Sequence, residues 1–269
     1  MVKKLFKHEF LAYARVMVVV YIILLTVATA GRIVQIFEND SVAYTIVSVF
    51  SGITYGVCVC ATITFLFAFS IVRFYKNLFT HEGYLTFTLP VTSSQQIVVK
   101  TITTLSFDII TWTAILLSGC IFTAGELLTE IVKAFCYVLE QIFALAGMHT
   151  VIIGIELVGL LLLAYLSNIL LYYTFISIGQ LFKKNRILAA IGAYFVYYIF
   201  TQIISTVCSI LFSLLAYTPI FEKFILLIAR HPYASIHIAL WCVILLSGIF
   251  AMICFFVIRR IITKKLNLE

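Results

Sequence analysis

Two acidic side chains lie inside long apolar stretches of the sequence, where a charge is unfavourable if the stretch crosses a bilayer. Asp108 interrupts residues 101–125, and Glu156 interrupts residues 148–182. A charge at the bilayer centre costs about 2.5–3.5 kcal/mol on insertion scales, so such residues usually face a cavity or a partner. At about 1.5 Å per helical residue, Asp108 would lie near mid-depth and Glu156 nearer one surface. Both are therefore candidates for a polar pathway, and a role in locking helices together stays open for each.

Catalytic and cofactor chemistry finds little support elsewhere in the chain. His81 is next to Glu82, but adjacent residues diverge on a helix, which favours a solvated loop histidine over an acid–base pair. The sequence contains no GxxxxGK[ST] phosphate loop and no HExxH zinc motif. None of its seven cysteines belongs to a CxxC pair or has a histidine at metal-ligand spacing. We predict no catalytic residue, no cofactor and no metal bound by this chain.

The composition is that of a membrane protein. Apolar residues make up 64% of the 269 residues and charged residues 11%, whereas ordinary globular domains have about 45–50% and about 25%. The net charge of +7 comes from lysines and arginines that cluster at the ends of apolar runs. They form no stripe interleaved with exposed aromatics, which nucleic-acid binding would require. The sequence therefore predicts an all-α polytopic membrane protein with no nucleic-acid partner.

Six apolar stretches approach or exceed the roughly 20 residues that a membrane-spanning helix needs; they lie within 16–31, 41–72, 101–125, 148–182, 187–220 and 234–258. The first stretch also resembles a signal peptide, but the long polar segment before it favours a membrane span that is not cleaved off. With the N-terminus inside, only four of the 18 lysines and arginines fall outside, namely Arg32, Lys133, Lys223 and Arg230. Because basic residues favour the cytoplasmic side, we expect both termini in the cytoplasm.

Three segments between or before the spans have helical patterns of their own. Residues 1–14 place Phe6, Phe10 and Tyr13 on one face, which predicts an interfacial elbow helix on the inner leaflet. Residues 126–146 carry apolar side chains at helical spacing, which predicts an external amphipathic helix. Residues 219–233 hold an apolar run too short to span, between two prolines, which predicts a re-entrant or interfacial helix before the last span.

The segment 73–92 mixes aromatic residues with single charges and is too apolar for a free loop. This composition is typical of a surface that docks another protein, although a loop folded back on its own bundle stays open. Pro90 ends whatever precedes it, and the run TSSQ at 92–95 is a capping-box pattern that begins the third span.

Within this segment the run EGYLTFTLPVT at 82–92, together with KHEF at 7–10 in an amphipathic N-terminus, resembles permease subunits of ATP-binding-cassette exporters of the type-2 class. The small six-span permeases of Gram-positive bacteria are the most similar. The likeness in topology covers the whole chain: an elbow helix, six spans and re-entrant helices before the last span. It implies that the loop after the second span couples to a separate ATPase, and it assigns this role to Arg73, Lys76, Glu82 and Tyr84.

The resemblance also implies partners and a location. Two copies of an ABC ATPase subunit would bind the ATP and magnesium, and a second permease subunit, identical or similar, would complete the pathway among the lipids of the bacterial plasma membrane. The expected task is export of an amphiphilic substrate, such as an antimicrobial or signalling peptide. A proton-coupled secondary transporter that uses Asp108 is the alternative. An intramembrane enzyme is a third, although the chain has one deep aspartate and no deep histidine to serve it.

Overall fold

The computed structural model describes residues 2–37, 39–80, 91–182 and 184–264. Throughout these residues the regular structure is helical, and six of the helices are long and apolar enough to cross a membrane. The prediction of an all-α polytopic fold is confirmed. The chain is a multi-pass membrane protein.

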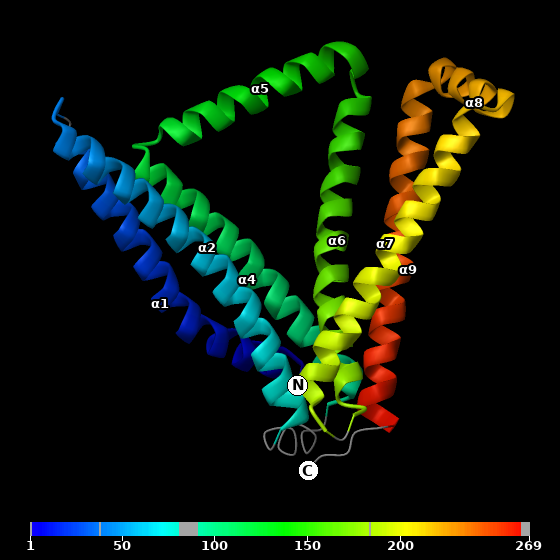
Figure 1. Ribbon diagram of the computed structural model, residues 1–269, viewed down its shortest axis with the longest axis horizontal. Helices are drawn as coiled ribbons and strands as arrows, with labels where there is room; N and C mark the ends of the chain where they lie inside the picture. Colours follow the sequence, from blue (N-terminus) through cyan, green and yellow to red (C-terminus); the bar gives the residue numbers. More distant parts are fainter. Residues whose placement is uncertain (1, 38, 81–90, 183, 265–269) are drawn as a thin grey trace. The chain divides into compact units, whose positions relative to one another are not determined.

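The chain divides into two compact units, Met1–Gln141 and Ile142–Glu269. The first contains α1 (Val2–Ile36), α2 (Val42–Phe79), α4 (Ser93–Phe122) and most of α5 (Glu126–Ala146), and the second contains α6 (His149–Gly179), α7 (Arg186–Ala216), α8 (Pro219–Arg230) and α9 (Pro232–Lys264) (Figure 1).

Local chemistry explains where several helices begin. The Ser41 hydroxyl accepts a hydrogen bond from the Tyr44 amide at 3.2 Å and caps α2. At the start of α4, Thr92 and Gln95 form the capping box that the sequence predicts, with bonds of 3.4 and 3.1 Å. Such reciprocal bonds satisfy amide groups that have no partner inside the helix. Pro219 and Pro232 are the first residues of α8 and α9, where a missing N–H costs nothing.

In the first unit, α1 packs against both α2 and α4. It runs parallel to α4, because Tyr13 pairs with Thr104 and Tyr21 with Thr111, at nearly equal sequence separations of 91 and 90 residues. Between these helices lies a core cluster of Tyr13, Met17, Leu66 and Phe107. The Tyr13 ring stacks on Phe107 with centroids 5.2 Å apart. Stacked aromatic rings and buried apolar surface thus fix the register of α1.

In the second unit, α6 runs parallel to α9. The Ser167 hydroxyl donates to the Ser247 carbonyl at 3.2 Å, and Thr174 donates to the Cys254 carbonyl at 3.5 Å, both across 80 residues of sequence. Hydroxyl-to-carbonyl bonds of this kind join helices in an environment without water. α7 packs on α6 and touches α8. Of its 31 residues, all of which the structure describes, none is buried.

The segments predicted between the spans correspond to helical residues, with some different boundaries. Residues 2–14 are the first part of α1 and continue into the first span without a break. The residues 126–146 are those of α5. The segment 219–233 contains α8 and the first two residues of α9. α2 continues to Phe79, so its 38 residues extend about 57 Å, well beyond the roughly 30 Å of a hydrocarbon core.

Candidate functional site

The residues predicted to couple to an ATPase begin on the last two turns of α2. Arg73 is partly buried, and Lys76 is exposed in the last turn. Glu82 and Tyr84 lie outside the described residues. The segment 73–92 is therefore a helix end over its first seven residues, and its last residue, Thr92, caps α4.

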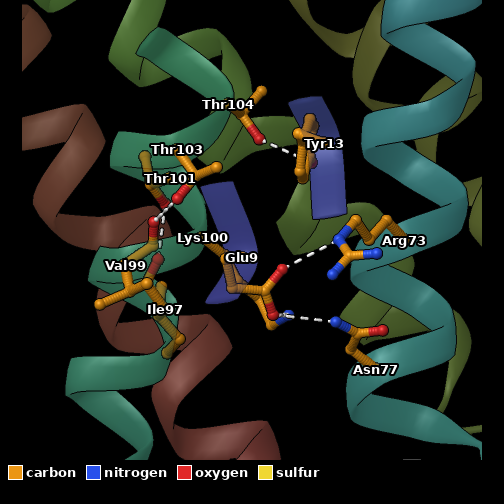
Figure 2. A network of polar contacts seen from close by, with 10 residues as sticks. All are labelled: Glu9, Tyr13, Arg73, Asn77, Ile97, Val99, Lys100, Thr101, Thr103 and Thr104. Atoms are coloured by element: carbon orange, nitrogen blue, oxygen red, sulfur yellow. Dashed lines mark hydrogen bonds and ion pairs between the residues drawn. The ribbon is translucent and has the colours of Figure 1, made fainter. Parts of the chain in front are cut away.

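The side chain that Arg73 contacts is Glu9 of α1. Figure 2 shows the Glu9 carboxylate pointing toward Arg73 and Asn77 of α2, with the side chain of Lys100 reaching it from α4. Arg73 Nε donates to Oε2 at 2.9 Å, Asn77 Nδ2 donates to Oε1 at 2.9 Å, and Lys100 Nζ donates to Oε1 at 2.8 Å. One carboxylate thus joins three helices that are far apart in the sequence.

This junction is largely shielded from solvent. The side chains of Glu9 and Lys100 are 9% and 6% exposed, and that of Arg73 is 23% exposed. Hydrogen bonds to charged groups are stronger than neutral ones, and their strength grows as water is excluded. Two cations around one carboxylate leave one positive charge, and the Arg73 guanidinium also lies over the Tyr13 ring, 5.5 Å from its centroid. The geometry holds the end of α2 and the first turns of α4 to α1.

Asp108 directly follows Phe107 on α4, about one turn beyond Thr104, and its side chain is partly buried. Within the described part of the chain its carboxylate has no ion pair. The Tyr21 hydroxyl, one turn away on the neighbouring helix α1, is 2.6 Å from Thr111 Oγ1 of α4. The Glu9 junction does not include Asp108.

Glu156 lies at the contact between α6 and α9, with its side chain 8% exposed. Its Oε2 is 2.8 Å from His237 Nδ1, and its Oε1 accepts a bond of 2.9 Å from Trp241 Nε1. Both oxygens of this carboxylate are therefore engaged by α9. His237 Nε2 is in turn 3.4 Å from His149 Nδ1, at the first residue of α6. This contact holds the two helices together near their first turns.

Sequence reasoning missed both of these partnerships. The sequence shows Glu9 only as part of the KHEF run, and it does not indicate that His237 meets Glu156, from which 81 residues separate it. One signal was available: Tyr233, His237 and Trp241 recur every fourth residue of the last span, which places polar atoms on one helical face. The sequence does not show that this face meets Glu156.

An apolar groove of about 690 Å³ lies in the second unit, between α6, α7 and α9. Its lining includes Phe175 and Ile178 of α6, Val196 and Phe200 of α7, and Phe250 of α9. Thr174 and Tyr197 are the lining residues that carry a hydroxyl group. Such a lining suits an acyl chain or an apolar side chain.

Comparison with known proteins gives no family for this chain: no protein-family model matches it, and neither do the curated proteins or the solved structures that were searched.

Proposed function

We propose that this chain is the transmembrane permease subunit of an ATP-driven ABC exporter, energised by a separate ATPase. The observation that carries the proposal is the Glu9 junction at the base of the connection between α2 and α4. In this assignment, that connection and Lys76, which is exposed in the last turn of α2, face the cytoplasm and dock the ATPase. The basic residues at this end, including Lys76, favour that orientation.

The junction gives a mechanical reason for the assignment. A displacement of the end of α2 is transmitted to Glu9 through its bonds with Arg73 and Asn77. A displacement of the start of α4 is transmitted to the same carboxylate through Lys100. Because α1 is one unbroken helix from Val2 to Ile36, a displacement at Glu9 moves the first span with the other two. Packed elements of this kind transmit force as rigid bodies rather than by bending.

Features of the second unit support the choice of partner and substrate. None of the residues of α7 is buried, although most of them are apolar, so its free faces contact lipid or another chain. A second permease subunit, identical or similar, would cover part of them. The groove of about 690 Å³ beside α7 has an almost entirely apolar lining. It suits the apolar part of an amphiphilic substrate, such as an acylated or amphipathic peptide.

The test is co-purification of an ATP-hydrolysing subunit, with charge reversal at Lys76. The tagged chain is purified from its native membranes, and ATP hydrolysis and the bound nucleotide-binding subunit are measured. Lys76→Glu reverses an exposed charge that makes no ion pair in the described part of the chain. Like charges across an interface cost several kcal/mol, so we expect at least a tenfold loss of co-purified ATPase.

Lys133→Glu is the matched control, because Lys133 is 74% exposed on α5 and predicted to lie outside. It should leave ATPase recovery unchanged. Arg73→Glu is a poorer probe, since it also breaks the bond to Glu9. If no ATP-hydrolysing subunit co-purifies with the wild-type chain, the exporter function is refuted. If the Lys76→Glu variant binds that subunit at full strength, the docking site at the end of α2 is refuted.

The proton-coupled alternative retains one observation in its favour. Asp108 is partly buried in a membrane-spanning helix and has no ion pair within the described residues. An acid in that setting can carry a proton. Transport that responds to a proton gradient in ATP-free vesicles, and that Asp108→Asn abolishes, would favour the alternative over the exporter.

A further inference from the structure

The contact between α6 and α9 places two imidazole nitrogens opposite each other. His149 Nδ1 and His237 Nε2 are 3.4 Å apart. This is longer than the 2.7–3.2 Å of a good hydrogen bond that a nitrogen donates, so a proton between the rings contributes little. The separation of the two nitrogens instead fits a metal ion bound between them.

A zinc ion bound by two imidazoles would produce this distance. Zinc–nitrogen bonds are about 2.0–2.1 Å long, so two nitrogens 3.4 Å apart subtend an angle of about 110° at a shared ion, close to the tetrahedral value of about 109°. Imidazole nitrogen is also the ligand type that zinc and its neighbours prefer.

The surroundings of the two rings match those of metal-binding histidines. Glu156 Oε2 lies 2.8 Å from His237 Nδ1, which places the ring proton on Nδ1 and leaves the Nε2 lone pair facing His149. A carboxylate behind a ligand histidine fixes its tautomer and raises its basicity. Trp241 Nε1 holds the other oxygen of Glu156 at 2.9 Å. The His149 ring is stacked on Tyr233, 4.9 Å away and parallel to within 2°.

The five residues of the arrangement come from two helices in fixed register. His149 and Glu156 are two turns apart on α6, and Tyr233, His237 and Trp241 follow one another every turn on α9. Glu156 and His237 are 8% and 20% exposed, whereas His149 is exposed at the first residue of α6. An ion could therefore arrive from the exposed side while the supporting carboxylate stays shielded.

We propose that His149 and His237 form a binding site for a divalent transition-metal ion of the zinc class, supported by Glu156 and bridging the first turns of α6 and α9. No group of three or more histidine, cysteine, aspartate or glutamate side chains in the described part of the chain is arranged to hold a metal. Water therefore supplies the remaining ligands, and exchangeable binding is expected rather than a permanent structural ion. The site does not rest on the transport function proposed above.

The experiment is Zn²⁺ titration of the purified full-length chain in detergent, carrying an affinity tag without histidines, by calorimetry. Co²⁺ substitution then reports geometry, because tetrahedral Co²⁺ has far more intense visible bands than octahedral Co²⁺. We expect one saturable Zn²⁺ per chain and the tetrahedral spectrum. His149→Gln should weaken Zn²⁺ binding at least tenfold. Glu156→Gln should weaken it about 10–100-fold, as removal of such supporting carboxylates does.

His149→Gln is the decisive variant, because His149 is exposed and the Glu156–His237 bond remains when it is replaced. His8→Gln, which removes an exposed imidazole from α1 in the other unit, is the matched control and should bind Zn²⁺ like the wild type. Absence of saturable Zn²⁺ binding by the wild-type chain would overturn the site, as would equal affinity of the wild type and His149→Gln. Equal affinity of the wild type and Glu156→Gln would overturn the supporting role of the carboxylate.

Discussion

Replacing Glu9 by glutamine tests the junction that joins α1, α2 and α4. All three neighbours of the carboxylate, Arg73 Nε, Asn77 Nδ2 and Lys100 Nζ, are donors at 2.8–2.9 Å. Glutamine keeps the size of the side chain but replaces one accepting oxygen with an NH₂ group that faces donors. It also removes the negative charge from beside two cations.

The magnitude follows mainly from Lys100. Its side chain is only 6% exposed and loses its carboxylate partner at 2.8 Å, whereas Arg73, at 23%, regains some solvation. Removing one member of a buried ion pair costs about 3–5 kcal/mol, because the other charge stays buried. We expect Glu9→Gln to lower the free energy of unfolding by about that amount. For a chain of this size the thermal midpoint should fall on the order of 10 °C.

A double-mutant cycle separates the ion pair from simple loss of packing. Glu9→Gln with Lys100→Met removes both charges, so that no buried lysine charge is left behind when the Glu9 carboxylate is lost. The double variant should therefore be more stable than Glu9→Gln alone, with a coupling free energy of about 0.5–3 kcal/mol. Stability is measured by equilibrium unfolding with SDS in mixed micelles and by thermal loss of helical circular dichroism.

Glu130→Gln is the matched control. Glu130 pairs with Lys133 at 3.5 Å, and both side chains are 74% exposed. Exposed pairs of this kind contribute about 0–1 kcal/mol, so the same chemical change should have little effect there. A Glu9→Gln protein as stable as the Glu130→Gln protein would show that the junction does not hold the three helices together.

Three further predictions concern other parts of the chain. Gly31→Ala should destabilise the first unit by about 1–3 kcal/mol in the same unfolding assay, because a Cβ there would clash with the Phe122 ring of α4. The control is Gly52→Ala, whose Cβ would have no atom within 4 Å. Equal stability of the two variants would contradict the close approach of α1 and α4. Asp108→Asn should insert normally and Asp108→Leu should lower transport, measured in vesicles at equal expression, and wild-type transport by the leucine variant would show that the carboxylate is dispensable. Reporter fusions at the C-terminus should be active only in the cytoplasm, and an external signal would overturn the predicted orientation.

The sequence by itself was sufficient for the membrane-spanning helices. A stretch such as 234–258 is apolar enough to cross a bilayer whatever its neighbours do, because backbone groups in lipid must bond within their own helix. The start of α4 is similarly local, since Thr92 and Gln95 cap it with bonds between residues three apart. Properties that depend on a few consecutive residues can be predicted without knowing the fold.

The extent of the helices was less predictable. The charges at Arg73 and Lys76 suggested an interface segment beginning where the apolar run ends, yet α2 continues to Phe79. A helix does not stop at the edge of the hydrocarbon region if its next residues also favour helix and find partners. Here the partner is Glu9, which bonds Arg73 and Asn77 on the continued face of α2.

Only the tertiary structure decided which polar side chains meet. The sequence identified Glu156 as an acid inside an apolar stretch, but not its contacts with His237 and Trp241, 81 and 85 residues away. Likewise it identified the charges of Arg73 and Lys100 without showing that both bind Glu9. These pairings depend on the register in which whole helices pack. That register is set by the sum of many apolar contacts along each helix, and no short run of residues contains it.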